Sequence, residues 1–281
     1  MARIGLNYLV AAPIPTAPAY GSLPTYGDGF VVGRAIEADI NISMNDNNLH
    51  ADNRVVNVDK SFANGTITLG VDEFGDGDEA SQIEVEEILT GGKIVEEDGE
   101  KYLDFGESPK LNTVGLGWIV PGRYPDREQK YFETVWYRQV TFGGTGAENA
   151  QTKGDNISWN TPTIDGIIKP VPGVNSETNI RRKSRFDTES EAIVWLNTIA
   201  NIDMTEDQLK GANANELYTL CKKYNITSVT VESETVQITS AASITAATKP
   251  AVITAILTAQ EAADTPASNN EETDDTNGIG G

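Results

Sequence analysis

Alternating apolar and polar residues limit much of the first 172 residues of this 281-residue chain to β structure. In residues 38–44 every second side chain is apolar, which is the period of a strand with one buried face. Residues 67–71 repeat the pattern after Asn64-Gly65, a pair that tolerates positive φ and therefore predicts a hairpin turn. Further strands are expected over residues 114–120, 130–142 and 156–168. The sequence thus predicts a mainly β domain from about Gly29 to Pro172.

Two stretches among the first 202 residues have helical patterns instead. Residues 78–89 carry acids in their first turn, where the helix dipole favours negative charge. A second helix is expected to start at a cap formed by Asp187 or Thr188, with Glu191 three residues after Thr188. The apolar stripe of this second helix consists of Ile193, Leu196 and Ile199.

Composition divides the chain into four regions. We expect an extended N-terminal arm at 1–29, a β-domain with a closing helix at 30–200, a small C-terminal helical and extended module at 201–262, and a disordered acidic tail at 263–281. Four prolines keep the arm extended, so it could lie along a neighbouring subunit. Helices are predicted in the module over 214–224 and 250–262, with alternating strand-like residues between them. The predicted fold class is therefore mainly β, sandwich-like or barrel-like, with a small α-rich C-terminal module.

The chain is strongly acidic, with a formal net charge of -21. Binding to a phosphate backbone requires clustered Lys and Arg, so this balance argues against a nucleic-acid-binding protein. One basic cluster, residues 181–185, interrupts the acidic surface. We interpret it as a solvated linker, with a contact patch for an acidic subunit as the alternative.

Only one histidine, His50, and one cysteine, Cys221, are present. They exclude an intrachain disulfide, a multi-histidine metal site and a Cys₂His₂ zinc site. We expect His50 on a surface turn and Cys221 in helix packing rather than in a catalytic pair. No apolar stretch approaches the ~20 residues of a membrane helix, so membrane insertion is not expected. The sequence predicts neither an enzyme nor a bound cofactor.

Acidic residues are densest between Asp72 and Glu107, where 14 acids accompany two lysines. A calcium loop would need Gly at its sixth position and Glu at its twelfth, and no starting Asp provides that spacing. We therefore interpret the segment as a solvated helix and loop rather than as a metal site.

Several blocks of the β-domain together resemble one protein family. They are LHADNRVVNVDKSFANGTITLGVDEF at 49–74, VGLGWIV at 114–120, KYFETVWYRQVTF at 130–142, AQTKGDNISWNTPTIDG at 150–166 and FDTESEAIVWLN at 186–197. In order and spacing these blocks resemble the major tail protein, or tail tube protein, of long-tailed, non-contractile bacteriophages. The resemblance covers roughly residues 5–200 and includes no catalytic motif. The C-terminal region partly resembles a helix, extended loop, helix module.

This resemblance implies a structural virion protein with a β-sandwich or barrel-like subunit and a flanking helix. Its subunits would form rings, typically hexameric, that stack into a hollow tube through which genome DNA is ejected. The implied partners are copies of itself, the tape measure protein inside the tube and the tail-end proteins, while DNA passes without specific binding. The implied location is the virion tail, after assembly in the host cytoplasm.

Two sets of residues are candidates for this function. The self-assembly candidates lie in the arm and in the first block of the resemblance, and they are Tyr8, Tyr20, Tyr26, Leu49, Val56 and Phe74. The candidates for an acidic lumen or loop are Asp72, Glu73, Asp76 and Asp78. Acids that line a bore would repel phosphates at close range, with a screening length of ~8 Å at physiological salt.

A monomeric carbohydrate-binding or adhesion module is the alternative function. It would use exposed aromatic side chains, and the chain has four tryptophans, namely Trp118, Trp136, Trp159 and Trp195. We expect these residues in the core and in subunit packing instead. A hydrolase ranks last, because nothing in the sequence brings two of the 42 acids into one pocket.

Overall fold

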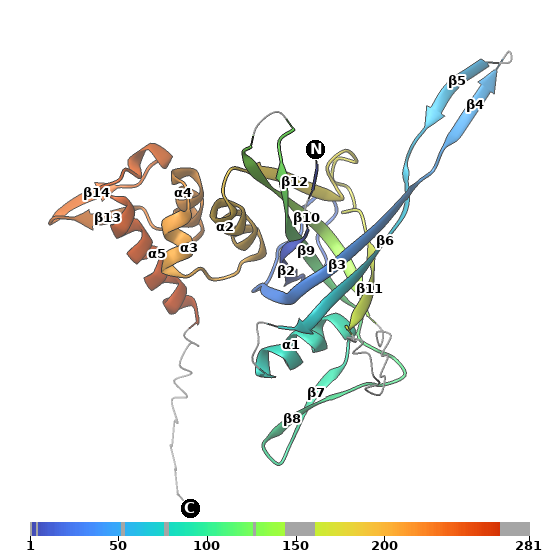
Figure 1. Cartoon of the computed structure of the whole chain (residues 1–281), viewed down its shortest axis with the longest axis horizontal. Helices are drawn as coiled ribbons and strands as arrows, with labels where there is room; N and C mark the ends of the chain where they lie inside the picture. The colour runs from blue at the N-terminus through green and yellow to red at the C-terminus, as the bar shows by residue number, and fades with distance from the viewer. Residues whose placement is uncertain are drawn as a thin grey trace, which may run out of the picture.

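A closed six-stranded antiparallel β-barrel forms the centre of the protein (Figure 1). The computed structural model describes residues 2–3, 5–51, 54–75, 79–125, 128–143 and 161–264. Around the barrel the strands follow in the order β9 (Asn112–Arg123), β2 (Asn7–Pro13), β3 (Phe30–Met44), β6 (Phe62–Phe74), β11 (Thr163–Ile168) and β10 (Lys130–Phe142). Pairing of β10 with β9 closes the ring, and the predicted mainly β fold is confirmed.

Shorter strands and helices surround the barrel. At its edges β1 (Ala2–Arg3) pairs with β9, and β12 (Arg181–Phe186) pairs with β10. Three hairpins project from the chain, and they consist of β4 (Asn47–Ala51) with β5 (Arg54–Asp59), β7 (Lys93–Glu97) with β8 (Glu100–Asp104), and β13 (Ser228–Val231) with β14 (Glu234–Gln237). The helices are α1 (Glu79–Thr90), α2 (Glu189–Ala200), α3 (Glu206–Gly211), α4 (Ala214–Lys223) and α5 (Lys249–Asp264), with a short 3-10 turn at Ala241–Ser243.

Alternate side chains of the barrel strands fill its interior. Leu9, Leu69 and Leu116, from three different strands, are almost completely buried there. Trp118 and Tyr137 stack inside the same cluster, with 5.4 Å between their ring centroids. The strands predicted over 114–120 and 130–142 are confirmed, and their period of two follows from this one-sided burial.

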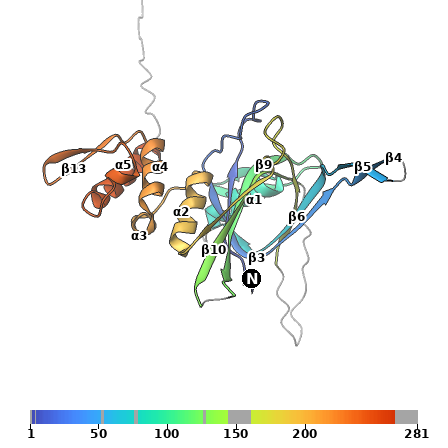
Figure 2. The same cartoon turned by 90° about the horizontal axis from the view of Figure 1, so that it is seen from above.

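Helix α2 covers the outside of the barrel over β2, β9 and β10 (Figure 2). Trp136 packs beneath it, directly over the backbone of Gly117, where a Cβ atom would lie 2.5 Å from the indole ring. Thr188 caps the helix by accepting a hydrogen bond from the Glu191 amide at 3.3 Å. The predicted helix is therefore confirmed, and its cap is Thr188 rather than Asp187.

The C-terminal module has a core of its own, formed by residues of α3, α4, β13 and α5 such as Leu209, Leu217, Val229 and Val252. The helices predicted over 214–224 and 250–262 are confirmed, as is the burial of Cys221. One side chain links helices within the module, and one helix links the module to the barrel. The Lys249 ammonium donates to the carbonyl oxygens of Lys210 and Ala212, both at 2.7 Å, and thereby satisfies the end of α3. Val194 of α2 belongs to the module core, so α2 is shared across the expected boundary at 200/201.

The prediction that residues 1–29 form an extended arm is wrong for its first half. Residues 7–13 form β2, which lies between β9 and β3, and Leu9 to Ala12 are fully buried. The proline-rich composition misled the prediction, because Pro13 is the last residue of the strand and the other prolines follow it. The irregular connection after β2 is thus confined to residues 14–29.

A second correction concerns the predicted turn at Asn64-Gly65. Both residues lie inside β6, where they pair with Ser43 and Ile42 of β3. Gly65 is needed for packing instead, because a Cβ atom there would come within 3.0 Å of Ile168. The β4–β5 hairpin joins the two strands, and it contains His50, which was expected on a turn.

Candidate self-assembly surface

Strands β3 and β6 leave the barrel as a ribbon that continues into the β4–β5 hairpin (Figure 1). β2 pairs with β3 only at residues 30–33. From residue 34 to 44, β6 is the only neighbour of β3 in the part of the chain that the structure describes. Unpaired N–H and C=O groups on such an edge can template pairing with another chain. The ribbon therefore presents a long open edge.

The two faces of this ribbon differ. Ala38, Ile40 and Ile42 are partly buried and pack against the barrel core, as their alternation predicted. Ile36 and Met44 are instead 50% and 54% exposed, although Met44 was expected on the buried face. A register shift between Ser43 and Met44 accounts for this change of face. The edge strand thus carries two large apolar side chains that the subunit leaves uncovered.

Leu49 and Val56, two of the predicted contact residues, lie in β4 and β5. The structure therefore brings them to the same projecting hairpin, beyond the barrel end of the ribbon (Figure 1). Two-stranded ribbons are at best marginally stable alone in water. Their role in contacts between subunits stays a prediction.

The three tyrosines of the predicted arm have different environments. The Tyr8 hydroxyl donates to Asn197 Oδ1 at 2.8 Å, which ties β2 to α2. Tyr26 packs edge-on against Trp136, whose indole N–H donates to the Tyr26 hydroxyl at 3.0 Å, and burial raises the pKa of Tyr26. Tyr20 is the most exposed of the three, with 86% of its surface accessible. Tyr8 and Tyr26 thus have packing partners within the subunit, and a contact of either residue with a neighbouring subunit stays a prediction.

Phe74 also packs within the subunit, and its role in self-assembly stays a prediction. It ends β6 and lies partly buried against the barrel core, opposite Gly33 of β3. Gly33 has a φ of +149°, and a Cβ atom there would collide with the backbone of Glu73, so only glycine permits this approach.

Two of the four acids predicted for a lumen or loop, Asp72 and Glu73, lie among the described residues. Asp72 is exposed and lies 3.9 Å from Arg34, a distance at which an exposed pair contributes little. Glu73 accepts a hydrogen bond from Gln82 of α1 at 3.4 Å. Asp76 and Asp78 lie outside the described residues. Among the residues that the structure does describe, no group of three or more potential metal ligands is found.

Strand β12 is a feature that the sequence interpretation missed. The basic cluster predicted as a linker pairs in register with β10, from Arg181 opposite Tyr137 to Phe186 opposite Phe132. Glu133 of β10 is only 7% exposed and receives Lys183 at 3.2 Å and Arg185 at 3.1 Å. This bond raises the pKa of the Arg185 guanidinium. The sequence signal for this strand was Glu133, the one acid in β10, but the basic residues that pair with it lie about 50 residues away in the chain.

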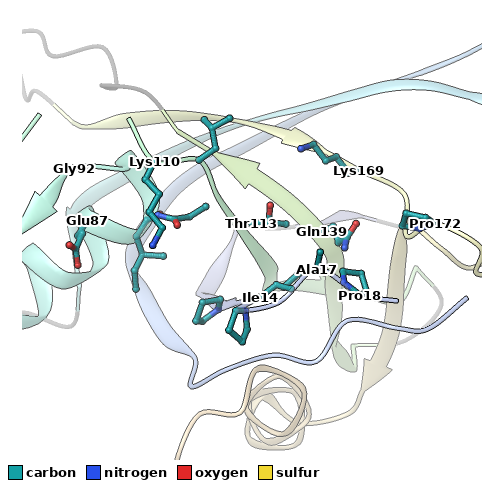
Figure 3. A pocket seen from close by; sticks show the side chains of 15 residues that line it. Ile14, Ala17, Pro18, Glu87, Gly92, Lys110, Thr113, Gln139, Lys169 and Pro172 are labelled. Carbon is teal, nitrogen blue, oxygen red and sulfur yellow. The ribbon is translucent and has the colours of Figure 1, made fainter. Parts of the chain in front are cut away.

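The pocket in Figure 3 has a volume of about 600 Å³ and lies between the segment after β2 and the start of β9. Prolines form part of its wall, and Lys110 and Lys169 reach its opposite sides (Figure 3). Glu87 is the only acid among its lining residues, and its carboxylate accepts a hydrogen bond from the Ile94 amide at 3.1 Å. The hydroxyl groups of Thr113 and Thr141 are hydrogen-bonded to each other, with 2.9 Å between their oxygens.

Comparison of the sequence with known protein families finds no matching family model, and comparison with curated proteins finds no match either. None of the described helices is long and apolar enough to cross a lipid bilayer. The open edge of β3 and its exposed apolar residues are therefore the features from which a function can be inferred.

Proposed function

We propose that this protein is a structural subunit that assembles with copies of itself into stacked hexameric rings, which form the tail tube of a long-tailed bacteriophage. The observation that carries the proposal is the open edge of β3, which extends over residues 34–44 and bears Ile36 and Met44 on the surface. Pairing this edge with a neighbouring subunit would satisfy its backbone groups and cover both side chains. Repeated around a closed ring, the same contact leaves no edge open.

Charge supports a role as a conduit. Residues 1–186 carry 27 acids and 17 bases, and this acidic balance would repel DNA phosphates rather than hold them. Asp72 and Glu73 lie on β6, a barrel strand that continues into the ribbon. The virion tail, a tape measure protein within the bore and tail-end proteins belong to the same proposal. DNA would pass through the tube during ejection without specific binding.

The alternative of a carbohydrate-binding module has less support, because that function needs exposed aromatic rings. Trp118 and Trp136 are 4% and 1% exposed, and Trp195 packs against Phe186 with 6.0 Å between ring centroids. Trp159 lies outside the described residues. The expectation that tryptophans serve packing is confirmed for the three others.

Shortening the ribbon tests the proposal. Asn45 and Ser61 already face each other across it, with the Asn45 amide donating to the Ser61 carbonyl at 2.7 Å. Replacing residues 46–60 by a two-residue Asn-Gly turn should therefore leave the barrel folded. We expect the shortened protein to remain monomeric by sedimentation and negative-stain microscopy while the full chain forms rings or tubes. Equal assembly by both proteins would contradict the role of the β4–β5 hairpin, because the shortened protein keeps the edge of β3 at residues 34–44.

A further inference from the structure

Two hairpins of the protein each carry a pair of like charges in direct register. Next to the turn of the β9–β10 hairpin, Arg123 lies opposite Lys130. Next to the turn of the β7–β8 hairpin, Glu97 lies opposite Glu100. All four residues are exposed. Like charges that face each other across antiparallel strands are destabilising, so each hairpin would gain from an opposite charge supplied from outside.

Neither pair is neutralised within the subunit. Among the described residues, no acid forms an ion pair with Arg123 or Lys130, and no base forms one with Glu97 or Glu100. Lys101 of the same hairpin could neutralise one of the two acids, but its ammonium pairs with Glu84 of α1 at 3.1 Å. The Tyr102 hydroxyl donates to Glu100 Oε2 at 3.1 Å, which leaves the negative charge of Glu100 in place. Within the part of the chain that the structure describes, both pairs thus keep their charge for a partner.

The two hairpins lie on opposite sides of the barrel (Figure 1). They cannot meet within one subunit, so an opposite charge for each must come from another molecule. We propose that the β9–β10 hairpin of one copy docks on the β7–β8 hairpin of the next, pairing Arg123 and Lys130 with Glu97 and Glu100. This inference rests on the proposed self-assembly and names one of its contacts.

Apolar groups lie beside the charges on both surfaces. Val95 and Tyr102 face each other on the same side of the β7–β8 hairpin as Glu97 and Glu100, and Tyr102 is 46% exposed. Beside the basic pair, half-buried Tyr124 packs on Tyr131 with 4.9 Å between ring centroids. An apolar centre with a charged rim is the usual anatomy of a protein interface.

The contact joins two different surfaces and is therefore head-to-tail. A head-to-tail contact that does not close on itself repeats in one direction and generates a stack. Electrostatic pairing at the rim fixes the register of such a stack and makes it sensitive to salt.

Charge reversal tests this contact. The variant Glu97→Lys/Glu100→Lys replaces two facing negative charges by two facing positive charges. The repulsion within the hairpin therefore stays, while the sign of the charge that it offers to a partner is reversed. Arg123→Glu/Lys130→Glu is the matching variant of the other hairpin. We expect each variant alone to raise the protein concentration needed for assembly by about tenfold or more, as followed by sedimentation at low salt. Combining all four substitutions in one chain should restore assembly.

The control is Glu232→Lys/Glu234→Lys, which makes the same charge change in the exposed β13–β14 hairpin. It should assemble like the unmodified chain. If unmodified protein assembles and the one-sided reversals behave like this control, the proposed contact is overturned while the tube function stands. Failure of the unmodified protein to assemble at any salt concentration would overturn both.

Discussion

Replacing Glu216 with glutamine should flatten the pH dependence of unfolding. Glu216 is 8% exposed in α4, and its Oε1 atom has no hydrogen-bond partner among the described residues. Burial raises its pKa to about 7, and the nearby charge of Glu191 adds to the shift, while the Asn213 amide and the Lys249 charge oppose it. The folded protein therefore holds a proton on this carboxyl that the unfolded chain, with a pKa of 4.5, releases earlier.

The sign and size of the effect follow from this difference. Stability from the protonated Glu216 is fully present below pH 4.5 and is lost as the pH rises to about 7. At 1.36 kcal/mol per pKa unit, the loss is on the order of 3 kcal/mol. Glutamine keeps the side-chain oxygen that accepts from the Asn213 amide, now at 2.9 Å, but cannot ionise. Between pH 5 and pH 8 the free energy of unfolding of the Glu216→Gln variant should therefore fall less than that of the unmodified protein.

Urea unfolding of both proteins across this range measures the difference directly. The gap in stability between Glu216→Gln and the unmodified chain should grow with pH in favour of glutamine. Parallel pH profiles for the two proteins would refute the reasoning, because they would mean that Glu216 has the same proton affinity in the folded and unfolded chains.

Three further substitutions test the packing around the barrel by urea unfolding. Gly117→Ala should cost about 1–3 kcal/mol, because its Cβ would lie 2.5 Å from Trp136; an unchanged midpoint would show that the ring can move away. Thr188→Ala should cost about 1 kcal/mol through loss of the α2 cap, and no cost would mean that water replaces it. Glu133→Gln should cost about 1–2 kcal/mol, since Lys183 and Arg185 lose a carboxylate but stay partly solvated; equal stability at low salt would contradict this ion-pair role.

Local patterns were enough to predict the strands and helices that bury one face. The alternation in residues 38–42 follows from one-sided burial, and the stripe from Ile193 to Ile199 is the face of α2 that packs on the barrel. Thr188 could be recognised as a cap because its partner, Glu191, is only three residues away. In these segments the residues that decide the structure are close together in the sequence.

Contacts between distant residues explain the errors. Asn64-Gly65 has the composition of a turn, but Gly65 is selected by the approach of Ile168, about a hundred residues later. The basic residues 181–185 look like a solvated linker until Glu133 is brought beside them by β10. Tyr26 was expected to face a neighbour because its own partner, Trp136, is equally remote in the chain.

The candidate surface was predicted only in part. Residues Leu49 and Val56 fall on the projecting hairpin, as an assembly role would require. Tyr8, Tyr26 and Phe74 have packing partners within the subunit, which the sequence did not indicate. The open edge of β3 could not be foreseen, because it depends on where β2 stops pairing, at residue 33.

Electron microscopy of the purified full-length protein tests the central claim most directly. The account predicts hollow tubes of stacked rings, in which the edge of β3 at residues 34–44 pairs with a neighbouring subunit. Monomers at every protein and salt concentration, or assemblies in which this edge stays exposed to solvent, would contradict it.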